Sequence, residues 1–208
     1  MDKILNNFWG KSEHGQWFTY EKYQEDWQNY LNNSDLDLMT EQQRYFFEYS
    51  KLNWQRSQRI EKSYQINNEI SELIKNIDFP IYFNIVTENW CGDSAQNLPY
   101  FMKYLNMNPK FNVRIILRDE NLEVVDNYFK NTNPRSIPKL VAFDTNGNEL
   151  FVWGPRPKIA QDLVSQLIAE GYTNKEFNES LHLWYGRNKG KELEKEIVAL
   201  FENILTKK

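Results

Sequence analysis

The sequence predicts an α/β protein with a mixed four-stranded sheet, helices on both faces of that sheet, and helical extensions at both ends. Between residues 79 and 170, short hydrophobic runs alternate with helical patterns in the order strand, helix, strand, helix, strand, strand, helix. This order predicts a parallel βαβ unit followed by an antiparallel hairpin and a last helix. Residues 1–78 and 171–208 show helical periodicity only, and we expect all three parts to form one compact unit.

Composition excludes several classes of protein. The chain has 208 residues, of which 40% are hydrophobic and 26% charged, as in ordinary globular proteins. Its net charge is −4 with both signs interspersed, so no basic surface is expected for nucleic acid or an anionic membrane. The start lacks an apolar signal core, and no run approaches the roughly 18 apolar residues of a membrane span. We therefore expect a cytoplasmic protein that binds neither nucleic acid nor membrane.

The N-terminal extension contains two helical patterns. Residues 20–31 carry aromatic side chains at spacings of three and four, which is one helix face. Thr40 followed by residues 41–43 resembles a capping box, and no Pro or Gly follows before Pro80. This second pattern predicts one long helix, or two joined near the polar residues 55–59. Its second half has an apolar stripe that should pack on the following sheet: Ile66, Ile70, Leu73, Ile74 and Ile77.

The same extension is rich in aromatic side chains. One interpretation is that the rings bury the helices against the core. The alternative is a surface that binds a protein partner. The aromatic residues concerned are Phe8, Trp9, Trp17, Phe18, Tyr20, Tyr23, Trp27, Tyr30, Tyr45, Phe46, Phe47 and Trp54.

The central segment begins after Pro80. Residues 81–86 form the near-continuous hydrophobic run of a buried parallel strand. Asn146-Gly147 is a strong hairpin signal between the last two strands. The predicted strands are 81–86, 111–117, 139–143 and 149–153, the predicted helices are 91–106 (with Pro99 inside), 121–130 and 157–170, and two further helices are expected at 173–187 and 190–205.

Cys91 is the single cysteine, and it lies in the segment Trp90-Cys91-Gly92-Asp93-Ser94 at the first strand-to-helix junction. A cysteine at a helix N-terminus meets unsatisfied N–H groups and the positive end of the helix dipole, which favour the thiolate. The carboxylates of Asp93 and Glu88 oppose this effect. We therefore expect a moderately activated thiol. The alternative is an inert cysteine on a helix start that Asp93 and Ser94 cap.

This arrangement resembles the thioredoxin superfamily, in which the turn reads Trp-Cys-Gly-Pro-Cys. Pro138, in the segment 136–141, stands where that family places a cis-proline facing the active cysteine, and Gly154 also suits the pattern. The resemblance covers roughly residues 75–170 and implies a thioredoxin-like fold. Residues 88–99 are most similar to small bacterial thioredoxin-like proteins with Trp-Cys-Gly-Asp followed by Ser or Cys, Ala-Gln and a helical proline.

Two departures from the family pattern change the implied chemistry. Ser94 stands at the place of the second cysteine and cannot attack a mixed disulfide, and Ile85 stands at the place of the family's buried acid. The resemblance therefore implies a monothiol thiol-disulfide oxidoreductase in which Cys91 attacks a disulfide-containing protein or a small-molecule mixed disulfide and an external thiol resolves the product. Trp90 and Ile137 would form an apolar rim around the thiol, although Trp90 can also be a packing residue.

Two other functions remain open. One is a non-catalytic binding or scaffold protein whose extensions contact a partner. The other is an iron–sulfur carrier, because Cys-Gly-Asp-Ser resembles the Cys-Gly-Phe-Ser of monothiol glutaredoxins. No resident cofactor or metal is expected otherwise, since His14 and His182 are isolated in the sequence. Three cations either attract an anionic thiol to the site or form solvated surface: Arg135, Arg156 and Lys158.

Overall fold

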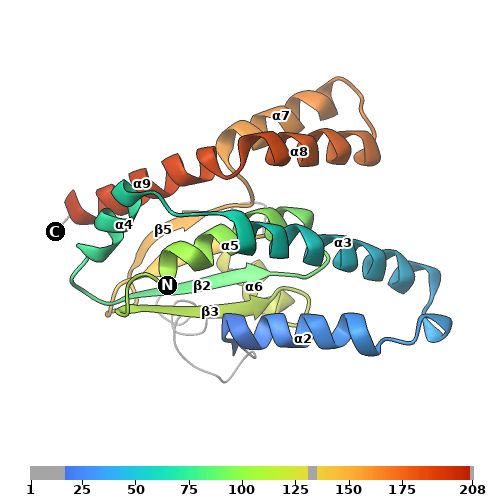
Figure 1. The fold of residues 1–208 in the computed structure, drawn as a ribbon, viewed down its shortest axis with the longest axis horizontal. Coiled ribbons are helices and arrows are strands. Elements are labelled where there is room, and N and C mark those ends of the chain that lie inside the picture. The colour runs from blue at the N-terminus through green and yellow to red at the C-terminus, as the bar shows by residue number, and fades with distance from the viewer. Residues whose placement is uncertain (1–16, 131–134, 207–208) are drawn as a thin grey trace. The chain divides into compact units, whose positions relative to one another are not determined.

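The computed structural model describes residues 17–130 and 135–206 (Figure 1). They divide into two compact units between Pro155 and Arg156. Phe8, Trp9 and His14 lie outside the described residues. The first unit contains the sheet and its helices, and the second contains three helices.

A mixed sheet organises the first unit, and in the described residues it has five strands in the order β1-β3-β2-β4-β5. The β2 and β3 strands are parallel, and every other neighbouring pair is antiparallel (Figure 1). The predicted count of four strands is therefore wrong. The additional strand, β1, pairs with the edge of β3 and is too short for an alternating pattern to mark it. The strands are β1 (Trp17–Phe18), β2 (Ile81–Thr87), β3 (Phe111–Leu117), β4 (Lys139–Phe143) and β5 (Glu149–Trp153).

Helices cover both faces of this sheet. Helix α5 (Gly92–Leu105) packs on one face, where the Phe101 ring lies 4.7 Å from the Trp153 ring. Helix α6 (Leu122–Tyr128) packs on the other face, where Val125 joins a buried cluster with Val86 of β2. The alternation of side chains along each strand sends successive residues to these two faces, so the predicted mixed α/β architecture is confirmed.

In the described residues, three α-helices precede β2: α2 (Tyr20–Asn33), α3 (Glu41–Ser63) and α4 (Asn68–Lys75). The predicted capping box is present, because the Thr40 hydroxyl accepts from the Gln43 amide and the Gln43 side chain accepts from the Thr40 amide. The second pattern is two helices, but they are not joined at residues 55–59, which stay helical. The break falls before Asn67, whose side chain caps α4 by accepting from the Ile70 amide at 2.9 Å.

Aromatic rings join α2 to α3. The Trp27 indole donates to the Ser50 hydroxyl at 2.7 Å, and its ring lies 5.2 Å from that of Trp54. The Tyr20 hydroxyl donates to Glu61 at 2.6 Å. These contacts support the interpretation that the aromatic residues bury the N-terminal helices.

The second unit consists of α7 (Lys158–Ala169), α8 (Asn174–Asn188) and α9 (Lys191–Thr206). Within it, Ala160 and Val164 of α7 pack against Leu181 and Tyr185 of α8. Across residues 17–130 and 135–206, every helix is too short or too polar to cross a membrane.

Candidate active site around Cys91

The chain brings Cys91 and the Ile137-Pro138 segment together from 46 positions apart. Cys91 is the N-cap residue of α5, and its amide donates to the Glu88 carbonyl at 3.2 Å. Its Sγ lies 3.3 Å from the Ile137 carbonyl oxygen, to which the thiol donates a hydrogen bond. The Ile137–Pro138 peptide bond is cis. The antiparallel pairing of β2 with β4 creates this proximity, because Cys91 follows β2 and Pro138 immediately precedes β4.

The thiol is buried. Only 8% of Cys91 is exposed, and it belongs to an apolar cluster with Val86, Phe129 and Ile137. The Trp90 ring packs against the same cluster and is itself partly buried. Trp90 and Ile137 therefore belong to the apolar surroundings of Cys91, which is almost inaccessible to solvent.

Burial decides the protonation state of Cys91. It raises the pKa of the thiol to about 11, and the negative charge of Asp93 adds to the increase, whereas the Ser94 hydroxyl and the amides of Ser94 and Asp93 offset only part of it. The expectation of a moderately activated thiol is therefore wrong for this conformation. The helix N-terminus does favour the thiolate, but desolvation of a charged sulfur in an apolar cluster outweighs that effect.

Neither Ser94 nor Ile85 can replace the missing second thiol or acid. Ser94 is 2% exposed in the first turn of α5, and no side chain caps the start of this helix with a hydrogen bond. Ser94 therefore does not cap the helix. Ile85 is fully buried between Leu140 and Ile115 on the neighbouring strands. Gly92 is the first residue of α5.

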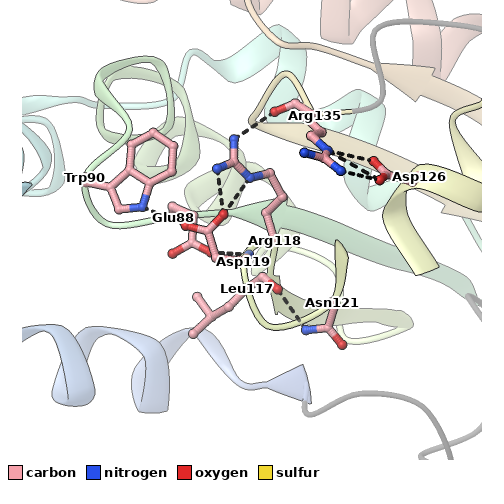
Figure 2. A network of polar contacts seen from close by, with 8 residues as sticks. All are labelled: Glu88, Trp90, Leu117, Arg118, Asp119, Asn121, Asp126 and Arg135. Carbon is pink, nitrogen blue, oxygen red and sulfur yellow. Dashed lines mark hydrogen bonds and ion pairs between the residues drawn. The ribbon is translucent and has the colours of Figure 1, made fainter. Parts of the chain in front are cut away.

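Glu88 is the carboxylate with the most perturbed environment beside the site. It is 7% exposed, and its Oε1 accepts a 2.7 Å hydrogen bond from the Asp119 amide (Figure 2). Burial raises its pKa to about 7, and the carboxylates of Asp119 and Glu120 act in the same direction, whereas the Asp119 amide and Arg118 oppose the rise. Glu88 therefore changes charge near neutral pH, three residues before the thiol.

Glu88→Gln is expected to remove a pH-dependent loss of stability. Because the folded protein binds the Glu88 proton more tightly than the unfolded chain, the stability that Glu88 contributes is fully present below the unfolded pKa of 4.5 and is lost as pH rises to about 7. The loss amounts to about 3 kcal/mol between pH 4 and pH 8. Urea unfolding at both pH values should show that the free energy of unfolding of the variant, relative to the wild type, is higher at pH 8 than at pH 4 by this amount. The same difference in unfolding free energy between the two proteins at pH 4 and at pH 8 would contradict the account.

Helix α3 forms one side of the site. Asn53 is fully buried, its amide donates to the Asn89 carbonyl at 3.1 Å, and its Oδ1 accepts from Arg56 at 2.9 Å. Nearer the start of α3, the Phe46 ring lies 5.4 Å from the Trp90 ring. The sequence did not place these residues at the site, although Phe46 is among the aromatic residues of the N-terminal extension. A polar Asn on the same helical face as Phe46 and Ile60 was the available signal.

Asn53→Ala is expected to lower the free energy of unfolding by about 2 kcal/mol, because it leaves the Asn89 carbonyl unpaired and opens a small cavity. Asn29→Ala is the matched control, since Asn29 is exposed on α2 and should change stability by less than about 0.5 kcal/mol. Urea unfolding measures both. Equal effects of the two substitutions would show that Asn53 does not hold the site loop.

Of the other predicted polar residues in the described part of the chain, Arg135 belongs to the first unit with Cys91. Arg135 pairs with Asp126 of α6 at 2.8 Å. Arg156 and Lys158 belong to the second unit. His182 lies on α8 with its ring 6.2 Å from Tyr185.

Comparisons with known proteins agree with this fold. A family model described as Thioredoxin matches residues 39–171, more than half of the chain. A protein of unknown function from Pseudomonas aeruginosa has 15% identity and a TM-score of 0.52, covering 85% of this chain and 91% of its own. An HIV epitope-scaffold has 15% identity and a TM-score of 0.56, covering 97% and 96%. These two structures are similar in fold alone, and no curated protein matches the chain. On the family match, the chain belongs to the thioredoxin family.

Proposed function

We propose that this protein is a monothiol thiol-disulfide oxidoreductase that uses Cys91 as its nucleophile and depends on an external thiol. The observation that supports it is the 3.3 Å contact between the Cys91 sulfur and the Ile137 carbonyl at the start of α5. An incoming disulfide sulfur would lie against the same backbone edge, in the apolar setting of Trp90 and Ile137. Gly92, Asp93 and Ser94 complete the first turn and position the cysteine, and the conformation of Pro138 sets the direction of the Ile137 carbonyl.

The chemistry requires two exchanges. The Cys91 thiolate attacks one sulfur of a disulfide, such as the glutathione sulfur of a glutathionylated protein, and the protein thiolate leaves. A disulfide now joins Cys91 to glutathione. Because Ser94 cannot attack it, a second, external thiolate attacks the glutathione sulfur and releases Cys91 as a thiolate. The net reaction transfers glutathione from the substrate to the external thiol, and it consumes no separate oxidant or reductant.

The high pKa of Cys91 makes this activity slow at neutral pH, because only the thiolate attacks. Substrate binding that replaces the hydrogen bond to Ile137 would free the sulfur for reaction. The external thiol must also be abundant, and a reducing cytoplasm supplies such a thiol. The proposal therefore includes a cytoplasmic location for this protein.

Turnover of a glutathionylated peptide in the presence of reduced glutathione tests the proposal. The wild type should show turnover that rises with pH between 7 and 9, and Cys91→Ser should show none. Ser94→Ala, which removes the hydroxyl that lowers the Cys91 pKa but leaves the thiol, should lower the turnover without abolishing it. No turnover by the wild type at pH 9 would refute the proposal.

A second candidate is a non-catalytic scaffold, and the burial of Cys91 is the observation that favours it. A scaffold would use exposed aromatic residues of the N-terminal extension, such as Tyr45 and Trp17, which are 58% and 47% exposed. Removing residues 1–60 cannot test this, since Phe47 and Ile60 of α3 are buried in the first unit. Tyr45→Ser is the better probe. Partner capture that survives Cys91→Ala and fails with Tyr45→Ser would favour the scaffold.

A further inference from the structure

Trp90, next to the thiol, is held on three sides. Its ring packs against Phe46 on one side, and the Arg118 guanidinium lies over it, 4.7 Å from the ring centroid. Its indole N–H donates to Asp119 Oδ2 at 3.1 Å (Figure 2). A guanidinium over an indole is a favourable cation–π arrangement. The conformation of Trp90 therefore depends on Arg118 and Asp119, which directly follow β3.

The same guanidinium also reaches the loop that carries Ile137. Its Nη1 donates to the Arg135 carbonyl at 2.9 Å, and its Nε and Nη2 both donate to Asp119 Oδ1, at 2.8 and 2.5 Å (Figure 2). The side chain of Arg118 is 18% exposed, compared with 47% for Asp119. The Arg135 side chain is anchored separately by Asp126. One cation thus joins the end of β3, the Trp90 turn and the loop two residues before Ile137.

We propose that Arg118 is a positioning residue that holds the Trp90 turn and the Ile137-Pro138 loop together over Cys91. Arginine suits this task because its planar group can stack on a ring and donate in several directions at once, which a lysine ammonium cannot do. The proposal rests on the proposed function for the effect on turnover. Its effect on access to the thiol is independent of that function.

Arg118→Met tests it, because methionine keeps apolar contact with Trp90 and removes every donor. Loosening the Trp90 turn and the Ile137-Pro138 loop should let a small alkylating reagent react with Cys91 about tenfold faster at pH 8. The kcat/KM for a glutathionylated peptide should fall by a similar factor, because the larger substrate needs both the turn and the loop in place. Opposite changes in the two rates distinguish positioning from a general loss of structure.

The matched control is Arg114→Met. Arg114 lies on β3, the strand that Arg118 follows, and stacks on Trp17 with 5.2 Å between its guanidinium and that ring. Its loss should change both rates by less than twofold. Alkylation should also be insensitive to low urea concentrations in Arg118→Met, since local opening exposes little additional surface whereas global unfolding exposes much.

An alkylation rate within twofold of the wild type in Arg118→Met, or an equal increase in Arg114→Met, would overturn the proposal. If Arg118→Met does not fold, Arg118→Lys replaces it. Intermediate rates are then expected, and wild-type values for both rates would overturn the proposal. If the wild type shows no turnover, the proposed function fails, but the alkylation rates still decide the role of Arg118.

Discussion

Gly154→Ala is expected to lower the free energy of unfolding by about 4 kcal/mol, the largest stability effect of any substitution considered for this chain. Gly154 follows β5 with φ of +120°, a conformation that side chains rarely adopt. A Cβ atom there would lie 2.1 Å from the Pro138 carbonyl oxygen. That oxygen is backbone, so the clash can be relieved only by moving the loop before β4 or the end of β5.

Urea unfolding of the variant measures this effect, and Gly186→Ala is its control. Gly186 lies in helix α8, where a Cβ meets nothing within 4 Å, so alanine should be neutral or stabilise by up to about 1 kcal/mol. Because Pro138 adjoins Ile137, Gly154→Ala should also alter the reactivity of Cys91. A loss of less than about 1 kcal/mol would show that Pro138 and Gly154 are not in close contact.

Alkylation of Cys91 is expected to be about tenfold slower than that of an unfolded cysteine at pH 7. A thiol of pKa about 11 is about one part in 10⁴ thiolate at this pH, against about one part in 10² at the ordinary cysteine pKa of 9.0. The greater nucleophilicity of a more basic thiolate recovers about tenfold of this difference. The rate should then rise about tenfold per pH unit from 7 to 9, without a plateau.

The same chain in concentrated urea supplies the control, because Cys91 is its single cysteine and is then fully exposed. Its alkylation should level off near pH 9, two units earlier than in the folded protein. A plateau below pH 8 in the folded protein would contradict the dominance of burial and would indicate that the helix N-terminus decides the protonation state.

The sequence predicted the sheet and its helices well because their patterns are local. The predicted bounds of β3, β4 and β5 agree with the structure, and the other predicted elements differ by a few residues at their ends. The miss at β1 has a simple cause, since two residues carry no period and their strand exists only through pairing with β3. The break before α4 was misplaced because polar side chains such as Asn53 and Ser57 are buried in α3. In the sequence alone, a run of polar residues indicates the end of a helix.

At the site, the sequence indicated which residues meet but not how deeply they are buried. The strand order brings Cys91 and Pro138 to one edge, and the hydrogen bond to Ile137 agrees with that placement. The pKa of Cys91 depends on the cluster around it, which includes Phe129 of the segment after β3, and no local pattern reports this. Arg118 could have been considered, because it follows β3 and the carboxyl ends of parallel strands meet at one edge.

Intact-mass analysis of Cys91 during turnover tests the monothiol proposal most directly. The protein is incubated with a glutathionylated peptide at pH 9, and reduced glutathione is then added. We expect a single glutathione adduct, absent from Cys91→Ser, that persists until the external thiol arrives and then decays at a rate proportional to its concentration. No adduct, or an adduct that decays without external thiol, would contradict the proposal that Cys91 works alone and depends on a thiol from outside the chain.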